Sequence, residues 1–94
     1  MININECDKI AIVIKAMAHP TRLFLMQAIS EREHCVCDLA NMVGADISTI
    51  SRHLSTLKNA GIVEGRKQNN QVFYKLIRPC LLDIYTCVLN ISEK

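Results

Sequence analysis

The sequence predicts a mainly α-helical fold with one β-hairpin, in the order ααααββα. Three observations support this prediction. Apolar residues recur at helical spacing over much of the chain, Gly or Pro separates most of these stretches, and two runs of β-forming residues precede the last helix. A chain of 94 residues has the size of one domain, so residues 1–94 are expected to form a single unit.

A proline separates the first two predicted helices. Apolar side chains at helical spacing predict the first helix over residues 5–17. His19-Pro20-Thr21 ends it and begins a second helix that runs to about Ser30. The reason is that proline is excluded from a helix interior but suits the first turn.

The next two predicted helices flank a short glycine turn. Cys35 is expected at the N-cap of a helix over residues 36–43, which Gly44 ends. Asp46 is expected to cap a longer helix over residues 47–60. Two helices joined in this way form a helix-turn-helix.

A hairpin and a last helix complete the pattern. The β-rich runs 62–67 and 71–77 are separated by three residues, 68–70, and the two asparagines there tolerate left-handed turn conformations. Pro79 begins a last helix that runs to about Ile91. The whole order predicts a winged helix-turn-helix, in which the hairpin is the wing.

The charge is unevenly distributed. The net charge is only +2, but residues 46–78 carry six Lys and Arg against two acidic residues. The two flanking segments, 1–45 and 79–94, are each slightly acidic. Such asymmetry is expected of a nucleic-acid-binding element, and a solvated basic hairpin without a partner is the alternative.

The helix over residues 47–60 has one apolar and one polar face. Ile50, Leu54 and Leu57 share the apolar face, whereas the opposite face carries hydroxyl, amide and guanidinium groups and no acidic side chain. These groups suit phosphates and base edges in the DNA major groove. The predicted DNA contacts are Ser48, Thr49, Ser51, Arg52, His53 and Ser55 on this helix and Arg66 and Lys67 on the wing. His53 has an alternative role as a partly buried, hydrogen-bonded side chain.

The apolar content predicts a homodimer. Half of the residues are apolar, which is more than one small core can bury, and the last helix is apolar around much of its circumference. The longest apolar run has five residues, far short of the roughly 20 that span a membrane. The N-terminal segment also lacks the pattern of a signal peptide. A cytoplasmic location is therefore expected, where five cysteines suit metal binding or redox sensing better than disulfides.

Five segments of the chain resemble a known family, in the same order and spacing. They are residues 15–23, 35–40, 50–54, 57–63, and 66–68 together with 72–76. With them the chain resembles the arsenic-repressor (ArsR/SmtB) family of metal-sensing transcriptional repressors. The resemblance implies a homodimer joined through the first and last helices. It also implies repression at a palindromic double-stranded DNA operator, and release of that operator when an inducer binds.

Cys35 and Cys37 are the candidate inducer site. At the start of a helix their sulfurs can converge, and the positive helix end favours the thiolate, which selects soft ions. Arsenite-sensing members of the family have a third cysteine where this chain has Ala40. Cadmium- and lead-sensing members add cysteines from the N-terminal region, which makes Cys7, from either subunit, the expected third ligand. Three sulfurs suit arsenite, antimonite or lead, whereas cadmium needs another donor such as His34.

The remaining cysteines leave alternatives open. Cys80 and Cys87 are seven residues apart on one face of the predicted last helix. They are small buried hydrophobic residues, a second thiolate site or members of a redox pair. A redox-sensing repressor is accordingly the second functional hypothesis. A metal-buffering or protein-interaction module without operator binding is the third. No spacing of histidines and carboxylates indicates catalysis, so the chain is not expected to be an enzyme.

Overall fold

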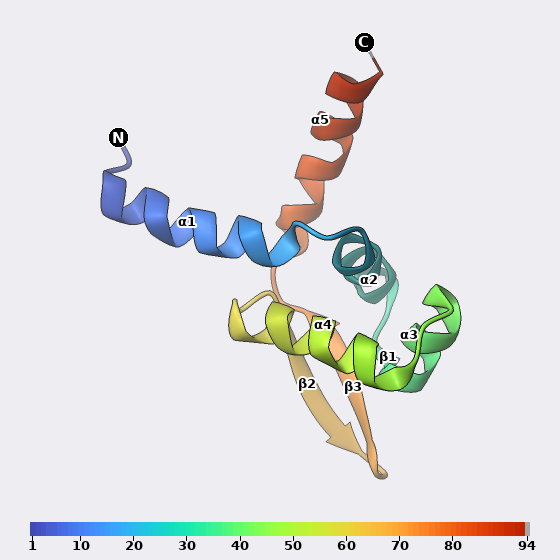
Figure 1. Ribbon diagram of the computed structural model, residues 1–94. Coiled ribbons are helices and arrows are strands. Elements are labelled where there is room, and N and C mark those ends of the chain that lie inside the picture. Colours follow the sequence, from blue (N-terminus) through green and yellow to red (C-terminus); the bar gives the residue numbers. More distant parts are fainter. Residues whose placement is uncertain (94) are drawn as a thin grey trace.

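The computed structural model describes residues 1–93 (Figure 1). The helix-turn-helix and hairpin form a compact body, from which the first and last helices project. The elements in chain order are α1 (Ile4–Met17), α2 (Pro20–Glu31), β1 (His34–Cys35), α3 (Val36–Val43), α4 (Ile47–Asn59), β2 (Val63–Gln68), β3 (Gln71–Leu76), the 3-10 helix η1 (Pro79–Leu82) and α5 (Asp83–Ser92).

Side-chain caps set the starts of the first two helices. Asn3 accepts a hydrogen bond from the Glu6 N–H at 2.9 Å, and the Glu6 carboxylate accepts one from the Asn3 N–H at 3.2 Å. This reciprocal pair begins α1 one residue before the predicted start. At α2, the His19 Nδ1 accepts the Thr21 N–H at 3.1 Å, and Pro20 is the first helical residue. The predicted break between α1 and α2 is confirmed.

The turn between α3 and α4 also follows the prediction. Gly44 ends α3 with φ at 79°, a left-handed conformation that glycine adopts without steric cost. Asp46 caps α4 by accepting the Thr49 N–H at 3.2 Å. The helix-turn-helix is thus specified by local capping groups.

The sheet has three antiparallel strands in the order β1-β3-β2. Gln68 pairs with Gln71, so the wing turn is the two-residue Asn69-Asn70, shorter than the predicted three. Both asparagines have positive φ, 51° and 67°, as a tight hairpin turn requires. Strand β1 was not predicted, because two residues are too few to show a period in sequence.

The core lies between α2, α3, α4 and the base of the hairpin, and it includes the buried Ala16 and Met17 of α1 and the partly buried Tyr85 of α5. It brings together the predicted apolar face of α4 with the inner faces of its neighbours. Its largest fully buried side chains are Leu25, Met26, Leu39, Ile50, Leu54, Leu57, Ile62 and Val63.

The end of the chain differs from the single predicted helix. Residues Pro79–Leu82 form the 3-10 turn η1, and the α-helix begins only at Asp83. Cys80 therefore lies outside the α-helix that carries Cys87, and the argument from seven-residue spacing on one face does not hold. Both cysteines are exposed in the single chain.

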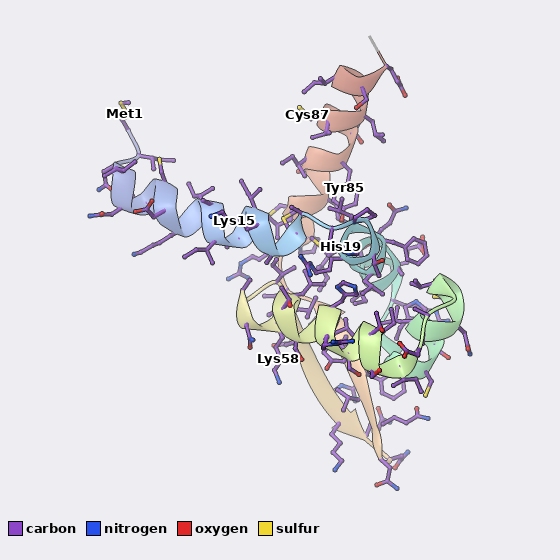
Figure 2. The ribbon with its side chains drawn as sticks, in the orientation of Figure 1. Met1, Lys15, His19, Lys58, Tyr85 and Cys87 are labelled. Atoms are coloured by element: carbon purple, nitrogen blue, oxygen red, sulfur yellow. The ribbon has the colours of Figure 1, made fainter. Side chains whose placement is uncertain are left out.

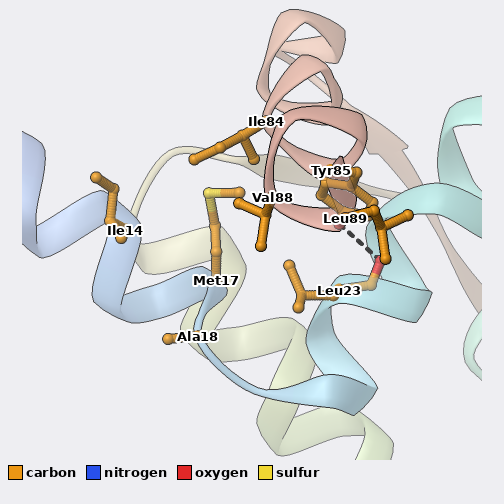
Figure 3. Close-up of a pocket in the computed structure, with 8 residues that line it drawn as sticks. All are labelled: Ile14, Met17, Ala18, Leu23, Ile84, Tyr85, Val88 and Leu89. Atoms are coloured by element: carbon orange, nitrogen blue, oxygen red, sulfur yellow. Dashed lines mark hydrogen bonds between the residues drawn. The ribbon is translucent and has the colours of Figure 1, made fainter. Parts of the chain in front are cut away.

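An apolar groove of about 290 Å³ separates α1 from α5 (Figure 3). Tyr85 lines this groove and donates its hydroxyl to the Leu23 carbonyl at 2.7 Å, and burial raises the pKa of Tyr85 to about 12. The residues that line the groove are Ile14, Met17, Ala18, Leu23, Ile84, Tyr85, Val88 and Leu89.

Among residues 1–93, no helix is both long and apolar enough to cross a membrane.

Candidate nucleic-acid interface and thiol groups

The polar face of α4 is presented to solvent as the sequence predicts. Ser48, Arg52 and Ser55 are exposed, and Thr49 and Ser51 are half-buried at its edges. The Ser48 hydroxyl donates to the Asp46 carboxylate at 3.3 Å. Hydrogen bonds from Thr49 foremost hold the pKa of Asp46 below its usual value. The cap therefore stays ionised and pins the first turn of the helix that carries the predicted DNA contacts.

His53 lies apart from this exposed face. Its Nδ1 is 3.3 Å from Nη1 of Arg22 on α2, and its ring centroid is 4.4 Å from that of His19. The structure therefore favours the alternative role of His53 as a partly buried, hydrogen-bonded side chain. The sequence did not reveal Arg22 and His19 as partners of His53, because no local spacing shows a contact across 31 residues or more.

On the wing, Arg66 and Lys67 are both exposed on β2. Arg66 donates to the Glu33 carboxylate at 2.9 Å and to the Gln68 side-chain oxygen at 2.7 Å, and its guanidinium lies 6.0 Å from the centre of the Phe73 ring. Lys67 is the neighbouring exposed cation. Arg66 is thus held in place by a residue of the loop before β1, a contact that the sequence did not indicate.

Cys35 and Cys37 stand at the start of α3 as predicted. Cys35 has the extended N-cap conformation, φ −82° and ψ 164°, and Cys37 lies in the first turn of the helix. The two differ in access, since Cys35 is buried in its pairing with Phe73 of β3 while Cys37 is exposed. A ligand that approaches from solvent therefore meets Cys37 first.

His34 is the buried polar residue beside this pair. Its side chain is almost fully covered, and its Nδ1 is 4.0 Å from the Asp38 carboxylate. Within the described residues that nitrogen has no hydrogen-bond partner. His34 therefore holds a buried nitrogen without a partner, next to Cys35 in the chain, but it does not form a group of three ligands with Cys35 and Cys37 among residues 1–93.

Cys7 is not brought to this site within one chain. It is exposed on α1, and the N-terminal half of α1 lies on the opposite side of the molecule from α3 (Figure 1). Within residues 1–93, no three His, Cys, Asp or Glu side chains are grouped closely enough to hold a metal ion. A site that combines Cys7 with Cys35 and Cys37 therefore requires the second subunit.

The comparisons with known proteins agree with this geometry. The family model described as "Bacterial regulatory protein, arsR family" matches residues 19–65, which include α2, α3, α4 and the start of the wing. The cadmium resistance transcriptional regulatory protein CadC of Listeria innocua is 33% identical over 81 residues, which are 85% of this chain and 68% of CadC. The chain belongs to the arsR family.

Solved structures of transcriptional regulators share the fold over nearly the whole of this chain. The antimony-specific transcriptional repressor AntR superposes with a TM-score of 0.83 and 28% identity, over 99% of this chain and 87% of AntR. The homodimeric winged helix-turn-helix domain of Mb0332 from Mycobacterium bovis superposes with a TM-score of 0.80 and 26% identity, over 95% and 82% of the two chains. The predicted winged helix-turn-helix is confirmed. ArsR-family proteins are transcriptional regulators, so the chain is a DNA-binding regulator and not an enzyme.

Proposed function

We propose that this ArsR-family chain is a dimeric repressor that releases a palindromic operator when a soft metal or metalloid binds its cysteine thiolates. The DNA-binding part of this proposal is supported by the exposed face of α4. This face presents Arg52 between Ser48 and Ser55, and its only carboxylate is that of the capping residue Asp46. Arginine can bind guanine bidentately, and the hydroxyls serve phosphates or base edges.

The remaining contacts follow from the arrangement of the fold. Ser48, Ser51 and Ser55 accompany Arg52 in the major groove, and Thr49 adds a hydroxyl at the edge of the same face. Arg66 and Lys67 of the wing contact phosphates beside the groove. A two-fold dimer joined through α1 and α5 presents two α4 helices to symmetric half-sites.

The sensing half rests on the placement of Cys35 and Cys37. Cys37 lies in the first turn of α3, which packs against α4, and Cys35 pairs with β3 of the wing. An ion that draws the two sulfurs together displaces one or both of these elements. Such a displacement alters the surface that meets DNA, which supplies a route from ligand to operator release.

The names of the relatives support the class of inducer. CadC is described as a cadmium resistance regulator and AntR as antimony-specific. The soft thiolates of this chain suit cadmium, lead, arsenite and antimonite. Cys7 of a second subunit is the proposed third ligand, and His34 is the proposed additional donor for cadmium.

Arg52→Ala tests the DNA-reading face. We expect a loss of operator affinity of about 10- to 100-fold, because one good bidentate base contact contributes roughly 1–3 kcal/mol. Lys58→Ala is the matched control, since Lys58 is an exposed cation near the end of the same helix and outside the proposed contacts. Fluorescence anisotropy with a duplex selected from a random library measures both. Unchanged affinity of Arg52→Ala would show that the assigned face is wrong.

Titration of the reduced protein–DNA complex tests the sensing site. Arsenite, antimonite, lead and cadmium are added separately, and at least one is expected to release the duplex from the unaltered protein. Cys35→Ser and Cys37→Ser are expected to abolish release, Cys7→Ser to weaken it, and Cys80→Ser to leave it unchanged.

Redox sensing is the competing function, and one observation favours it. Four of the five cysteines are exposed, and no third ligand accompanies the Cys35–Cys37 pair among the described residues of one chain. Release by peroxide in metal-free buffer, without any response to soft ions, would establish the redox function in place of the metal-sensing one.

A further inference from the structure

A cluster of three nitrogen-bearing side chains lies where α2 begins and α4 passes beneath it. His19 is placed between the end of α1, the start of α2 and the middle of α4 (Figure 2). Its backbone N–H donates to the Met17 carbonyl at 2.7 Å, and its Nδ1 caps α2. The other two members are Arg22 from the first turn of α2 and His53 from α4.

The hydrogen bond between Arg22 and His53 determines the state of the His53 ring. An arginine side chain only donates hydrogen bonds, so Nδ1 of His53 must be the acceptor in the 3.3 Å contact. An accepting Nδ1 carries no proton, which leaves the proton of the neutral ring on Nε2. This contact therefore exists only while the His53 imidazole is uncharged.

The surroundings of His53 favour that uncharged state. The charged and titratable groups that face it are His19 and Arg22 from the start of α2 and Arg52 from its own helix. Burial first, and then these three groups, hold the pKa of His53 below its ordinary value of 6.5. Among residues 1–93, Arg22 has no carboxylate within salt-bridge distance, and its buried Nε has no hydrogen-bond partner. The cluster is thus cationic through Arg22, and no carboxylate is present to offset a further positive charge.

His53 also lies between the proposed DNA-reading residue and the core along the chain. It follows Arg52 directly, and the next residue, Leu54, is fully buried in the core. The bond to Arg22 therefore joins α4 to α2 beside the residue proposed to read the major groove. We expect a change in this bond to alter how Arg52 is presented.

We propose that His53 is a positioning residue for DNA reading, which as a neutral acceptor from Arg22 holds α4 against the start of α2. The role rests on the proposed DNA-binding function and differs from a direct phosphate contact. The two roles predict opposite effects of acid. Protonation at Nδ1 ends the bond from Arg22 and weakens DNA binding, whereas a protonated histidine in contact with a phosphate would strengthen it.

Two substitutions at position 53 distinguish the hydrogen bond with Arg22 from the protonation of the imidazole. His53→Asn places an amide oxygen near the position of Nδ1, so it accepts from Arg22 at any pH. His53→Leu removes the acceptor. At about pH 7.5 we expect His53→Leu to weaken binding of the selected duplex about three- to tenfold and His53→Asn to restore most of that loss.

The pH profile is the decisive readout. From about pH 7.5 down to the pH at which nitrogen-15 NMR shows the His53 ring protonated, at constant ionic strength, the unaltered protein is expected to lose about three- to tenfold more affinity than His53→Asn. Equal profiles for the two proteins would overturn the inference. A gain in affinity of the unaltered protein relative to His53→Asn would overturn it too, in favour of a phosphate contact.

Nitrogen-15 NMR of the histidine rings tests the same point without DNA. We expect the Nε2–H tautomer of His53 in the free protein and a changed Nδ1 signal in Arg22→Met, which removes the donor. A protonated His53 ring at neutral pH, or an Nδ1 signal unaffected by Arg22→Met, would contradict the inference. If selection yields no duplex that the unaltered protein binds, the proposed DNA-binding function fails instead. The NMR result still decides the protonation state of His53.

Discussion

The body of the domain and its two terminal helices use apolar residues in different ways. In the body, from α2 to β3, eight large side chains are fully buried. In α5, all of which the structure describes, no side chain is buried, and α1 buries only Ala16 and Met17. Large exposed apolar side chains on these two helices are Ile4, Ile10, Ile12, Ile14, Ile84, Val88, Leu89 and Ile91. The body buries its largest apolar side chains within a single chain, whereas α1 and α5 present apolar surface that another molecule can cover.

Core substitution has the largest expected effect in this comparison. Leu54 is fully buried, so Leu54→Ala is expected to lower the free energy of unfolding by about 2–5 kcal/mol. Leu89 is 59% exposed, so Leu89→Ala is expected to leave the unfolding of the monomer nearly unchanged and to weaken association instead. Urea denaturation and sedimentation equilibrium measure the two quantities. Similar losses of folding stability in both variants would erase the distinction between the regions.

A charge in the apolar groove tests the proposed dimer. Val88 lines the groove and is 48% exposed, so Val88→Glu places a carboxylate where the second subunit is proposed to pack. We expect the dimer dissociation constant to rise by at least about 100-fold, because an unpaired buried charge is strongly unfavourable. Thr86→Glu is the control, since Thr86 is exposed on the same helix and does not line the groove. Equal dissociation constants for the two variants would place the interface elsewhere.

The hydrogen bond of Tyr85 joins the two regions. Its hydroxyl reaches from α5 to the Leu23 carbonyl of α2, as the dashed line in Figure 3 shows. Tyr85→Phe removes the donor and keeps the ring, with an expected loss of about 1 kcal/mol in the free energy of unfolding. Hydrogen exchange should show the loss mainly as faster exchange in α5. Unchanged protection of α5 would mean that apolar contacts alone hold this helix.

Acid is expected to act weakly, and on the body of the domain. The pKa of His53 is lower in the folded state than its ordinary 6.5, so folding favours the neutral ring. The associated stability is complete above about pH 6.5 and is lost as the pH falls toward the folded-state pKa. Thermal unfolding should therefore show a small additional loss in acid for the unaltered protein, compared with His53→Asn. The same acid dependence in both would assign the effect to another group.

Prediction from sequence succeeded where the physics is local. Caps and turn residues act within a few positions, so His19-Pro20, Gly44 and Asp46 marked the helix boundaries in advance. Amphipathic spacing likewise separated the buried face of α4 from the face that carries Arg52. Strand β1 and the 3-10 turn η1 escaped prediction, because each is too short to show a period.

The candidate sites divide in the same way. The placement of Cys35 and Cys37 at a helix start was predictable, because N-cap position depends on neighbouring residues. The burial of Cys35 was not, since it depends on pairing with Phe73, far along the chain. The contact of Arg66 with Glu33 and that of His53 with Arg22 likewise join residues more than 30 positions apart.

The sequence by itself determined the order of the elements, the basic segment and the polar face of α4, because these depend on short-range patterns of side-chain type. Only the tertiary structure decided which apolar residues are covered and which polar groups meet. It turned His53 toward Arg22, separated Cys7 from the Cys35–Cys37 pair within one chain, and left α1 and α5 exposed on either side of a groove. The physical reason is that burial and long-range hydrogen bonds depend on how the elements pack, which no local pattern specifies.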